Sequence, residues 1–399
     1  MVDGALDAAR REALDRIRTV LATTPVGDDR IVRYVDGLVA SSLVIARSRM
    51  EPERLVRICG PVTGDPATVM MAGLDNPDTD YWQAPISPEA IYVVEGRRGT
   101  AADLSFQLLT GDYDDPAALP ASAGTLTLRD LRCDSDGAYR FEVGPDAQGP
   151  NALVPTEPAA MLFCRETFGD WSTERPGTVS VRRLTGDAHP TPDGPIDDLA
   201  ADLLLRRTDV WLQFAPGAEA EILQAGFLHL IEPNTLVGPL QTSGGLPDQY
   251  SASGRFHLTD DEALVITVEQ ADAPYLGIQV GDDLFASLPY VDRCSSRTAA
   301  QSAADDDGRI RWVVSHRDPG VDNWIDTTGA ARGFLFIRWQ GLGPDDAPPT
   351  PTIEHIRLDA LPSVLPSAAR VDHRRRSDEL AARAADLRQS GRIRDTVLG

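Results

Sequence analysis

Two stretches of the chain consist of short runs of aliphatic, aromatic and β-branched residues, separated by turn-forming residues. The first stretch, from about residue 51 to 185, contains AIYVVEG, DLSFQLLTG, GTLTLRD, GAYRFEVG, AAMLFCRETF and TVSVRRL. The second, from about residue 246 to 360, contains ALVITVEQ, YLGIQV, RIRWVVS, GFLFIRWQ and TIEHIRLD. Runs spaced about ten to twenty residues apart favour antiparallel sandwiches over βαβ units. We therefore predict an α+β, β-rich fold with two antiparallel β-sandwich or jelly-roll-like units.

Helical periodicity marks the other parts of the chain. In residues 1–50, apolar residues recur at helical spacing in two stripes, which predict two helices. The segment DAHPTPDGP at 187–195 is a proline-punctuated linker, and IDDLAADLLLRRTDVWLQF and AEAEILQAGFLHLI after it predict helices. The predicted division is an N-terminal helical segment at 1–50, a first β-rich unit at 51–190, a helical section at 191–245, a second β-rich unit at 246–360 and a C-terminal basic helix at 361–399.

The charge balance restricts the chemistry and the partners of the chain. Its 399 residues include 61 acids and 38 bases, for a net charge of −23, and every base is an arginine. The absence of lysine excludes a P-loop, a pyridoxal Schiff base and a lysine general base. The acidic balance disfavours nucleic acid and anionic membranes as partners. With no apolar run of about 20 residues and no secretory signal pattern, we expect a cytoplasmic protein without a membrane span.

The C-terminal helix is the locally basic element. Residues 370–395 hold eight arginines and five acids. On an acidic body, such a helix is expected to clamp another part of the chain or a second subunit rather than nucleic acid. Assembly into a homo-oligomer therefore stays open.

Metal and cofactor motifs are missing from the sequence. The four cysteines, Cys59, Cys133, Cys164 and Cys294, lie far apart without CxxC spacing, so we expect buried free thiols and no zinc site. Asp75, Asp78 and Asp80 could ligate a hard cation, but the turn lacks the glycine and distal glutamate of an EF-hand. An ordinary Asn-Pro-Asp turn explains the stretch better, and we predict neither a metal nor a cofactor.

Four segments place charged and aromatic residues beside strands. GLDNPDTDYWQAP contains Asp78 and Tyr81, and CRETFGDW contains Arg165 and Asp170, which could form a charge pair at a strand end. YLGIQVGDDLFASLPYVDRCSSR contains Arg293 among hydroxyl groups, which could hold a carboxylate or phosphate or could satisfy loop carbonyls.

The fourth segment is HRDPGVDNWIDTTGAARGFLFIRWQ, His316 to Gln340. It offers Asp318 and the loop residues Asn323 and Trp324, and its strand ends near Arg338. His316 and Asp318 could act as a base and an orienting carboxylate, although no GxSxG elbow supplies a nucleophile. Turn chemistry explains most of the loop, whereas Trp324 packs either on the core or on a ligand.

These segments together resemble a bacterial family. DNPDTDYWQAPI, RETFGDW, SLPYVDRCSSR and SHRDPGVDNWIDTTG followed by GFLFIRW are similar to the domain of unknown function 1214 family, which is often paired with the related domain 1254. The resemblance implies a β-rich protein with two sandwich-like units and helical additions. Relatives often carry His, Trp and Gln where this chain has Ala330, Leu284 and Cys294.

The sequence supports two kinds of function. The leading hypothesis is a small-molecule site between the β units of a metal-free hydrolase, lyase or isomerase, because strand-end loops commonly converge on ligands. The alternative is a non-catalytic carbohydrate- or lipid-like ligand-binding sandwich or an oligomeric scaffold. The residues predicted to act as catalytic acids or bases are Asp78 and Asp318, and those predicted to bind ligand are Tyr81, Arg165, Asp170, Arg293, Asn323, Trp324 and Arg338.

Overall fold

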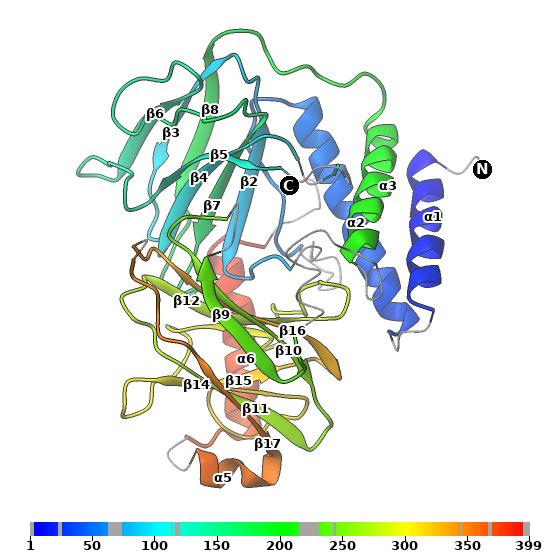
Figure 1. Cartoon of the computed structure of the whole chain (residues 1–399), viewed down its shortest axis with the longest axis vertical. Helices are drawn as coiled ribbons and strands as arrows, with labels where there is room; N and C mark the ends of the chain where they lie inside the picture. Colours follow the sequence, from blue (N-terminus) through cyan, green and yellow to red (C-terminus); the bar gives the residue numbers. More distant parts are fainter. Residues whose placement is uncertain are drawn as a thin grey trace.

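Two β-rich units lie end to end along the long axis of the molecule, and the N-terminal and middle helices pack on one side of them (Figure 1). The structure is a computed structural model that describes residues 4–22, 26–62, 74–112, 114–115, 120–214, 231–241, 245–343, 345–365 and 369–393. This arrangement confirms the predicted α+β, β-rich fold class with helices in the N-terminal, middle and C-terminal parts of the chain.

The first unit is a sandwich of two antiparallel sheets. One sheet has the order β1 (Val56–Arg57), β2 (Thr79–Pro85), β7 (Met161–Thr167), β4 (Asp103–Leu109) and β5 (Ser122–Thr127). The other has the order β6 (Ala138–Val143), β3 (Ile91–Arg97) and β8 (Thr178–Thr185). Alternate residues of these strands point between the sheets, and they form a core that includes Tyr92, Phe106, Phe141 and Leu162.

The second unit is a sandwich of the same kind. Its first sheet has the order β9 (Thr235–Gln241), β10 (Tyr250–His257), β16 (Arg332–Gln340), β12 (Tyr275–Gly281) and β13 (Ser296–Thr298). Its second has the order β15 (Trp324–Asp326), β14 (Ile310–Ser315), β11 (Glu262–Val268) and β17 (Thr352–Arg357), with β15 parallel to β14. Phe256, Leu264, Trp312 and Trp339 are among the residues of its core.

The second unit repeats the strand order of the first, with β15 as an additional strand. The order β1-β2-β7-β4-β5 corresponds to β9-β10-β16-β12-β13, and β6-β3-β8 corresponds to β14-β11-β17. The register agrees as well, because Gln107 pairs with Phe163 in the first unit and Gln279 pairs with Phe336 in the second. The chain therefore contains a structural duplication, and residues at equivalent positions of the two units can be compared directly.

Three helices form a further core beside the units, to which Leu284 and Ala286 of the second unit also belong. The three helices are α1 (Ala5–Val20), α2 (Asp28–Met50) and α3 (Ile196–Phe214), and Ile17, Val35, Leu204 and Trp211 pack between them. The helix predicted for 218–231 lies outside the described residues apart from Ile231. Strand β9 lies within 191–245, which the sequence assigned to helices, yet it pairs with β10 and belongs to the second sandwich.

The C-terminal segment joins the two units. After a 3-10 turn (Leu358–Ala360) and α5 (Leu361–Val364), helix α6 (His373–Gln389) runs along the molecule (Figure 1). Arg376, Arg383 and Arg392 are buried, and their guanidinium carbons lie 5.1, 4.0 and 4.4 Å from the ring centres of Trp324, Trp171 and Phe168, respectively. Cations over aromatic faces are favourable contacts, so this segment clamps both units within one chain.

Candidate functional site

The outward faces of β2, β7 and β4 in the first unit and of β12 and β16 in the second, with the segment before β2, carry a group of polar side chains. Side chains alternate along a strand, so Leu162 and Cys164 of β7 enter the core whereas Arg165 points away from it. We define the polar layer by its main residues, which are Asp75, Asn76, Asp78, Tyr81, Gln83, Ser105, Gln107, Arg165, Tyr275, Gln279, Arg338 and Gln340.

Hydrogen bonds between the segment before β2 and strand β12 join the two sides of the polar layer. The Tyr275 hydroxyl lies 2.8 Å from Oδ2 of Asp78 and 3.1 Å from Nδ2 of Asn76. Gln279 donates from Nε2 to the carbonyl oxygen of Asp75 at 3.0 Å. These hydrogen bonds fix the position of the first unit relative to the second.

Asp78 is the centre of this network. It is 1% exposed, and its Oδ1 and Oδ2 accept from Trp171 Nε1 at 2.9 Å and from the Tyr275 hydroxyl at 2.8 Å. Burial raises the pKa of Asp78, and the hydrogen bond from Tyr275 opposes that rise. Both carboxylate oxygens therefore have protein donors that orient Asp78, and its catalytic role stays a prediction.

Asp75, three residues earlier, is better placed for proton transfer. Its Oδ1 is buried without a hydrogen-bond partner, and its Oδ2 lies 3.5 Å from the Tyr290 hydroxyl. Burial raises the pKa of Asp75 to about 7, against the opposing effects of Ser287 and Arg338. A carboxyl group that titrates near neutral pH can both accept and donate a proton. From the sequence, Asp75 was considered only as a possible metal ligand. The burial that raises its pKa cannot be predicted from the turn in which it lies.

Arg165 and Arg338 occupy equivalent positions in the two units. Arg165 donates from Nη1 to Oε1 of Gln107 at 2.9 Å, and its guanidinium carbon lies 4.4 Å from the ring centre of Phe163. Arg338 donates to Oε1 of Gln279 and lies 4.9 Å from the ring centre of Phe336. Both arginines are half-buried. Each guanidinium is therefore held in place by a neutral amide and an aromatic ring.

Tyr81 lies within the electrostatic reach of both arginines. It pairs with Arg165 across the sheet, and its hydroxyl accepts from the backbone N–H of Asn76 at 3.1 Å. Burial raises the pKa of Tyr81, while the charges of Arg338 and Arg165 oppose the rise. The structure thus brings together three of the predicted ligand-binding residues, Tyr81, Arg165 and Arg338.

Several buried polar atoms beside the arginines have no hydrogen-bond partner. They are Nε2 of Gln83, Oγ of Ser105 and Oε1 of Gln340. Gln83 and Gln340 are two residues along their strands from Tyr81 and Arg338, and Ser105 pairs with Arg165, so all three belong to the same layer. Unpaired buried polar atoms cost free energy, and a polar ligand could satisfy them.

The Asp318 loop lies elsewhere and has a structural role. Asp318 accepts from Nε and Nη2 of Arg376 at 2.9 and 3.1 Å and therefore anchors α6. Asn323 exchanges hydrogen bonds with the backbone of Ala303 at 2.8 and 2.7 Å. Trp324 is buried and donates from Nε1 to the Ser315 carbonyl at 3.2 Å. Asp318, predicted as catalytic, and Asn323 and Trp324, predicted as ligand-binding, therefore do not share a site with Asp78.

Asp170 and Arg293 also lie apart from the arginine pair. Asp170 accepts from the Ser172 backbone N–H at 2.9 Å and from the Thr173 hydroxyl at 2.8 Å, so it closes its own turn. The side chain of Arg293 is 55% exposed and lies 3.7 Å from the carboxylate of Asp326. Asp170 therefore serves a local turn, whereas Arg293 forms a largely exposed ion pair with Asp326 of β15.

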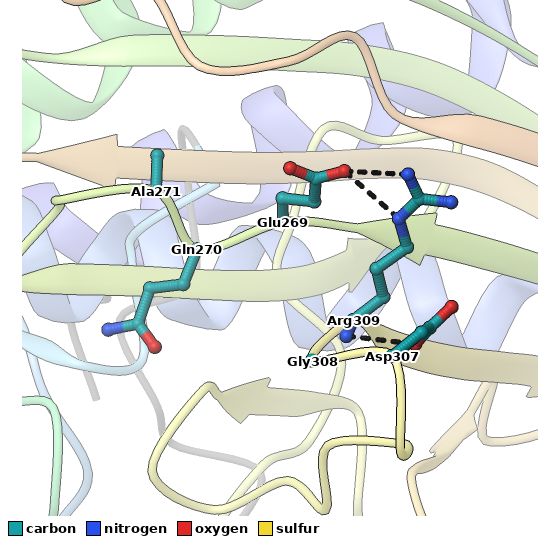
Figure 2. Close-up of a pocket in the computed structure, with 6 residues that line it drawn as sticks. All are labelled: Glu269, Gln270, Ala271, Asp307, Gly308 and Arg309. Atoms are coloured by element: carbon teal, nitrogen blue, oxygen red, sulfur yellow. Dashed lines mark hydrogen bonds and ion pairs between the residues drawn. The ribbon is translucent and has the colours of Figure 1, made fainter.

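We also considered the surface hollow, possible metal sites and the cysteines as functional sites. Figure 2 shows an open surface hollow in which Glu269 and Arg309 pair at 2.9 Å, with Asp307 bonded to the Arg309 backbone N–H. Each of its charged side chains already has a partner of opposite charge, because Asp307 also pairs with Arg311 at 2.7 Å. In the described ranges, no group of three or more His, Cys, Asp or Glu residues could hold a metal ion, and no helix is long and apolar enough to cross a membrane. Cys164 and Cys294 are buried thiols, but Cys133 is exposed, contrary to the prediction.

Comparisons with known proteins identify a shared fold. No family model and no curated protein matches the chain. Among solved structures, an uncharacterised protein from Burkholderia cenocepacia is 24% identical, with 89% of this chain and 98% of that chain covered and a TM-score of 0.71. The VPA0106 protein from Vibrio parahaemolyticus is 12% identical, with 81% and 98% covered and a TM-score of 0.40. The class defined by fold and site is a tandem β-sandwich protein whose two units are linked by buried polar contacts between the segment before β2 and β12.

Proposed function

We propose that the chain binds a small anionic organic molecule in the polar layer, where Arg165 and Arg338 hold its charged groups. The observation that carries the proposal is the pair of half-buried arginines, each oriented by a glutamine and a phenylalanine. A guanidinium held in this way is pre-organised for carboxylate or phosphate, because its planar fork matches two anionic oxygens. Among the described residues, the hydrogen bonds of Arg338 go to amide and carbonyl oxygens.

The proposed chemistry is proton transfer by Asp75. Its unpartnered Oδ1 and its pKa of about 7 suit a general acid–base that works near neutral pH. Tyr290 and Ser287 would orient the group. These features favour a metal-free lyase, isomerase or hydrolase of the kind expected from the sequence.

A binding protein without catalysis is the second candidate. It is favoured by the low exposure of Asp75, 6%, which restricts access to its carboxyl group. A lipid-like ligand suits the layer less well, since hydroxyl, amide and guanidinium groups line it. Asp75→Asn separates the two candidates, because it preserves the shape of the side chain but cannot take up a proton. Turnover would vanish in an enzyme, whereas a binding protein would keep its ligand affinity.

Calorimetric titration with inorganic phosphate, monocarboxylates and dicarboxylates tests the binding proposal. We expect Arg165→Gln and Arg338→Gln each to weaken binding about tenfold or more, as for the loss of a hydrogen bond to a charged group. Arg309→Gln, in the surface hollow of Figure 2, is the matched control and should bind as wild type does. Equal affinities in all four proteins, or no binding of any probe, would overturn the proposal.

Family membership and location are proposals as well. The four strings quoted from the sequence support membership of the domain of unknown function 1214 family. The four free cysteines support a reducing, cytoplasmic location, because exported proteins usually pair their cysteines.

A further inference from the structure

Arg338 is hydrogen-bonded to the peptide group that leads into Asp75. Its Nη2 donates to the carbonyl oxygen of Leu74 at 3.4 Å, and that carbonyl group is covalently linked to the backbone nitrogen of Asp75. Gln279 connects the same two residues, because its Oε1 accepts from Arg338 and its Nε2 donates to the Asp75 carbonyl oxygen at 3.0 Å. Arg338 and Asp75 therefore belong to one hydrogen-bonded cluster, although they lie in different units of the chain.

The charge of Arg338 acts on the carboxyl group of Asp75. Burial raises the pKa of Asp75 to about 7, whereas Ser287 and the charge of Arg338 oppose the rise. Oδ1 of Asp75 is buried and has no hydrogen-bond partner, so no donor at this oxygen stabilises the ionised form. Ionised Asp75 is therefore an internal counter-charge for Arg338, and the two groups influence each other's protonation and binding.

Other titratable and charged groups also surround Asp75. The segment after β12 supplies Tyr290, whose hydroxyl lies 3.5 Å from Oδ2 of Asp75. Burial raises the pKa of Tyr290 well above its usual value, so Tyr290 stays protonated in the range in which Asp75 titrates. Asp78, in the same segment as Asp75, accepts from Tyr275 and Trp171. The charged and titratable groups around Tyr290 include Arg392, Cys59 and Arg57.

An external anion at Arg338 would compete with the internal counter-charge. The anion would offset the effect of the guanidinium on ionised Asp75 and would add a negative charge near its carboxyl group. Both changes favour the protonated form of Asp75. If Oδ1 takes a proton from solvent, one anion and one proton enter the site together and its net charge is unchanged.

We propose that binding of an anion at Arg338 is coupled to the uptake of a proton by Asp75. This inference rests on the proposed function and specifies how pH regulates its anion site. Asp75 is protonated in the complex, so the step open to it is donation of that proton to the ligand, as a general acid.

Calorimetric titration with acetate and butyrate between about pH 6 and 8.5 tests the coupling. Both probes stay ionised there, because carboxyl groups in water titrate near pH 4. Below about pH 7 Asp75 is already protonated in the free protein, so the affinity should be nearly constant. Above that pH the affinity should fall, by about fivefold or more between pH 6 and 8.5. Binding enthalpies in Tris and in triethanolamine, two buffers with different ionisation enthalpies, should give an uptake of about half a proton or more at pH 7.5.

Two variants identify the group that takes up the proton. Asp75→Asn should bind with a nearly constant affinity at every pH and without proton uptake, and at pH 8.5 it should bind about fivefold more tightly than wild type. The matched control is Glu166→Gln, because burial also raises the pKa of Glu166 to about 7 but its charged neighbours include Asp80, Arg392 and Arg57. This control should keep the pH dependence and the proton uptake of wild type. Circular dichroism and thermal melting at each pH establish that the proteins are folded.

The wild-type measurements alone can refute the coupling, even if Asp75→Asn does not fold. Binding that Arg338→Gln weakens, but that is independent of pH and takes up no proton, would overturn the coupling and leave the anion site standing. A pH dependence that survives in Asp75→Asn, or that is lost in Glu166→Gln, would overturn it too. Binding that Arg338→Gln leaves unchanged would overturn the role of Arg338 in the proposed function. Wild-type protein that binds neither carboxylate would overturn the coupling together with carboxylate binding.

Discussion

The substitution Arg392→Met tests how strongly the C-terminal segment holds the two units together. Arg392 donates from Nε to Oδ1 of Asp80 at 3.1 Å and from Nη2 to the carbonyl oxygen of Pro77 at 2.8 Å. Both charged side chains are 3% exposed. Methionine keeps an apolar stem over Phe168 but removes the charge and the donors. The variant therefore isolates the polar contribution of this residue.

The expected loss of unfolding free energy is about 3 kcal/mol, at the low end of the range for breaking a buried ion pair. The low end applies because Asp80 keeps a second partner, Arg57, whose Nη2 lies 2.7 Å from Oδ1. The Pro77 carbonyl loses its donor, which costs about 1–3 kcal/mol when no water replaces it. The folding equilibrium constant should fall by about a hundredfold.

Urea denaturation followed by tryptophan fluorescence measures this loss. The matched control is Arg140→Met, since Arg140 pairs with Glu95 at 2.6 Å but the two side chains are 55% and 47% exposed. We expect that control to cost less than about 1 kcal/mol. Asp80→Asn combined with Arg392→Met should be less destabilising than the sum of the single variants by about 1 kcal/mol or more. A cost for Arg392→Met no greater than that of the control would refute the clamp.

Three further predictions concern other parts of the fold. Asp318→Asn should lower the unfolding free energy by about 1–3 kcal/mol, because Arg376 loses one of its two carboxylate partners and keeps only Glu379. The same variant should change anion affinity less than about twofold, and a larger loss of affinity in folded protein would place Asp318 at the site. Gly277→Ala should lower the melting temperature, because the added Cβ would lie 2.3 Å from the Tyr275 hydroxyl oxygen; an unchanged melt would contradict that packing. Burial, with a further effect of Asp248, raises the pKa of Asp103 to about 7, so the stability that Asp103 contributes below about pH 4 is lost as the pH rises through about 7. Asp103→Asn should therefore lose less stability than wild type between pH 4 and 8 in urea titrations, and an equal loss would contradict the raised pKa.

The sequence predicted the fold class because its signals are local. Alternation in AIYVVEG and GFLFIRWQ identifies β3 and β16, and the apolar stripes of residues 1–50 identify α1 and α2. Strand β9 was not identified, because TLVGPLQ is short and interrupted by a proline. Its pairing with β10 depends on a partner strand and cannot be read from the segment alone.

The candidate site was predicted only in part. Tyr81, Arg165 and Arg338 were identified because charged and aromatic residues at strand ends are unusual. Gln107 and Gln279 were missed, although a comparison of the two halves would have aligned FCR with FIR and SFQLL with GIQVG. An internal repeat was therefore the available signal for the arginine pair.

The sequence by itself determined two β-sandwiches, helices at both ends and an arginine-based chemistry without lysine, because periodicity and composition are properties of the chain. Only the tertiary structure decided which polar residues meet. Asp78 and Tyr275 are 197 residues apart and share a hydrogen bond, whereas Asp78 and Asp318 look alike in sequence and lie in different networks. The physical reason is that the pKa and the role of a carboxyl group depend on its burial and its partners. Both are set when the two units pack together and α6 closes over them.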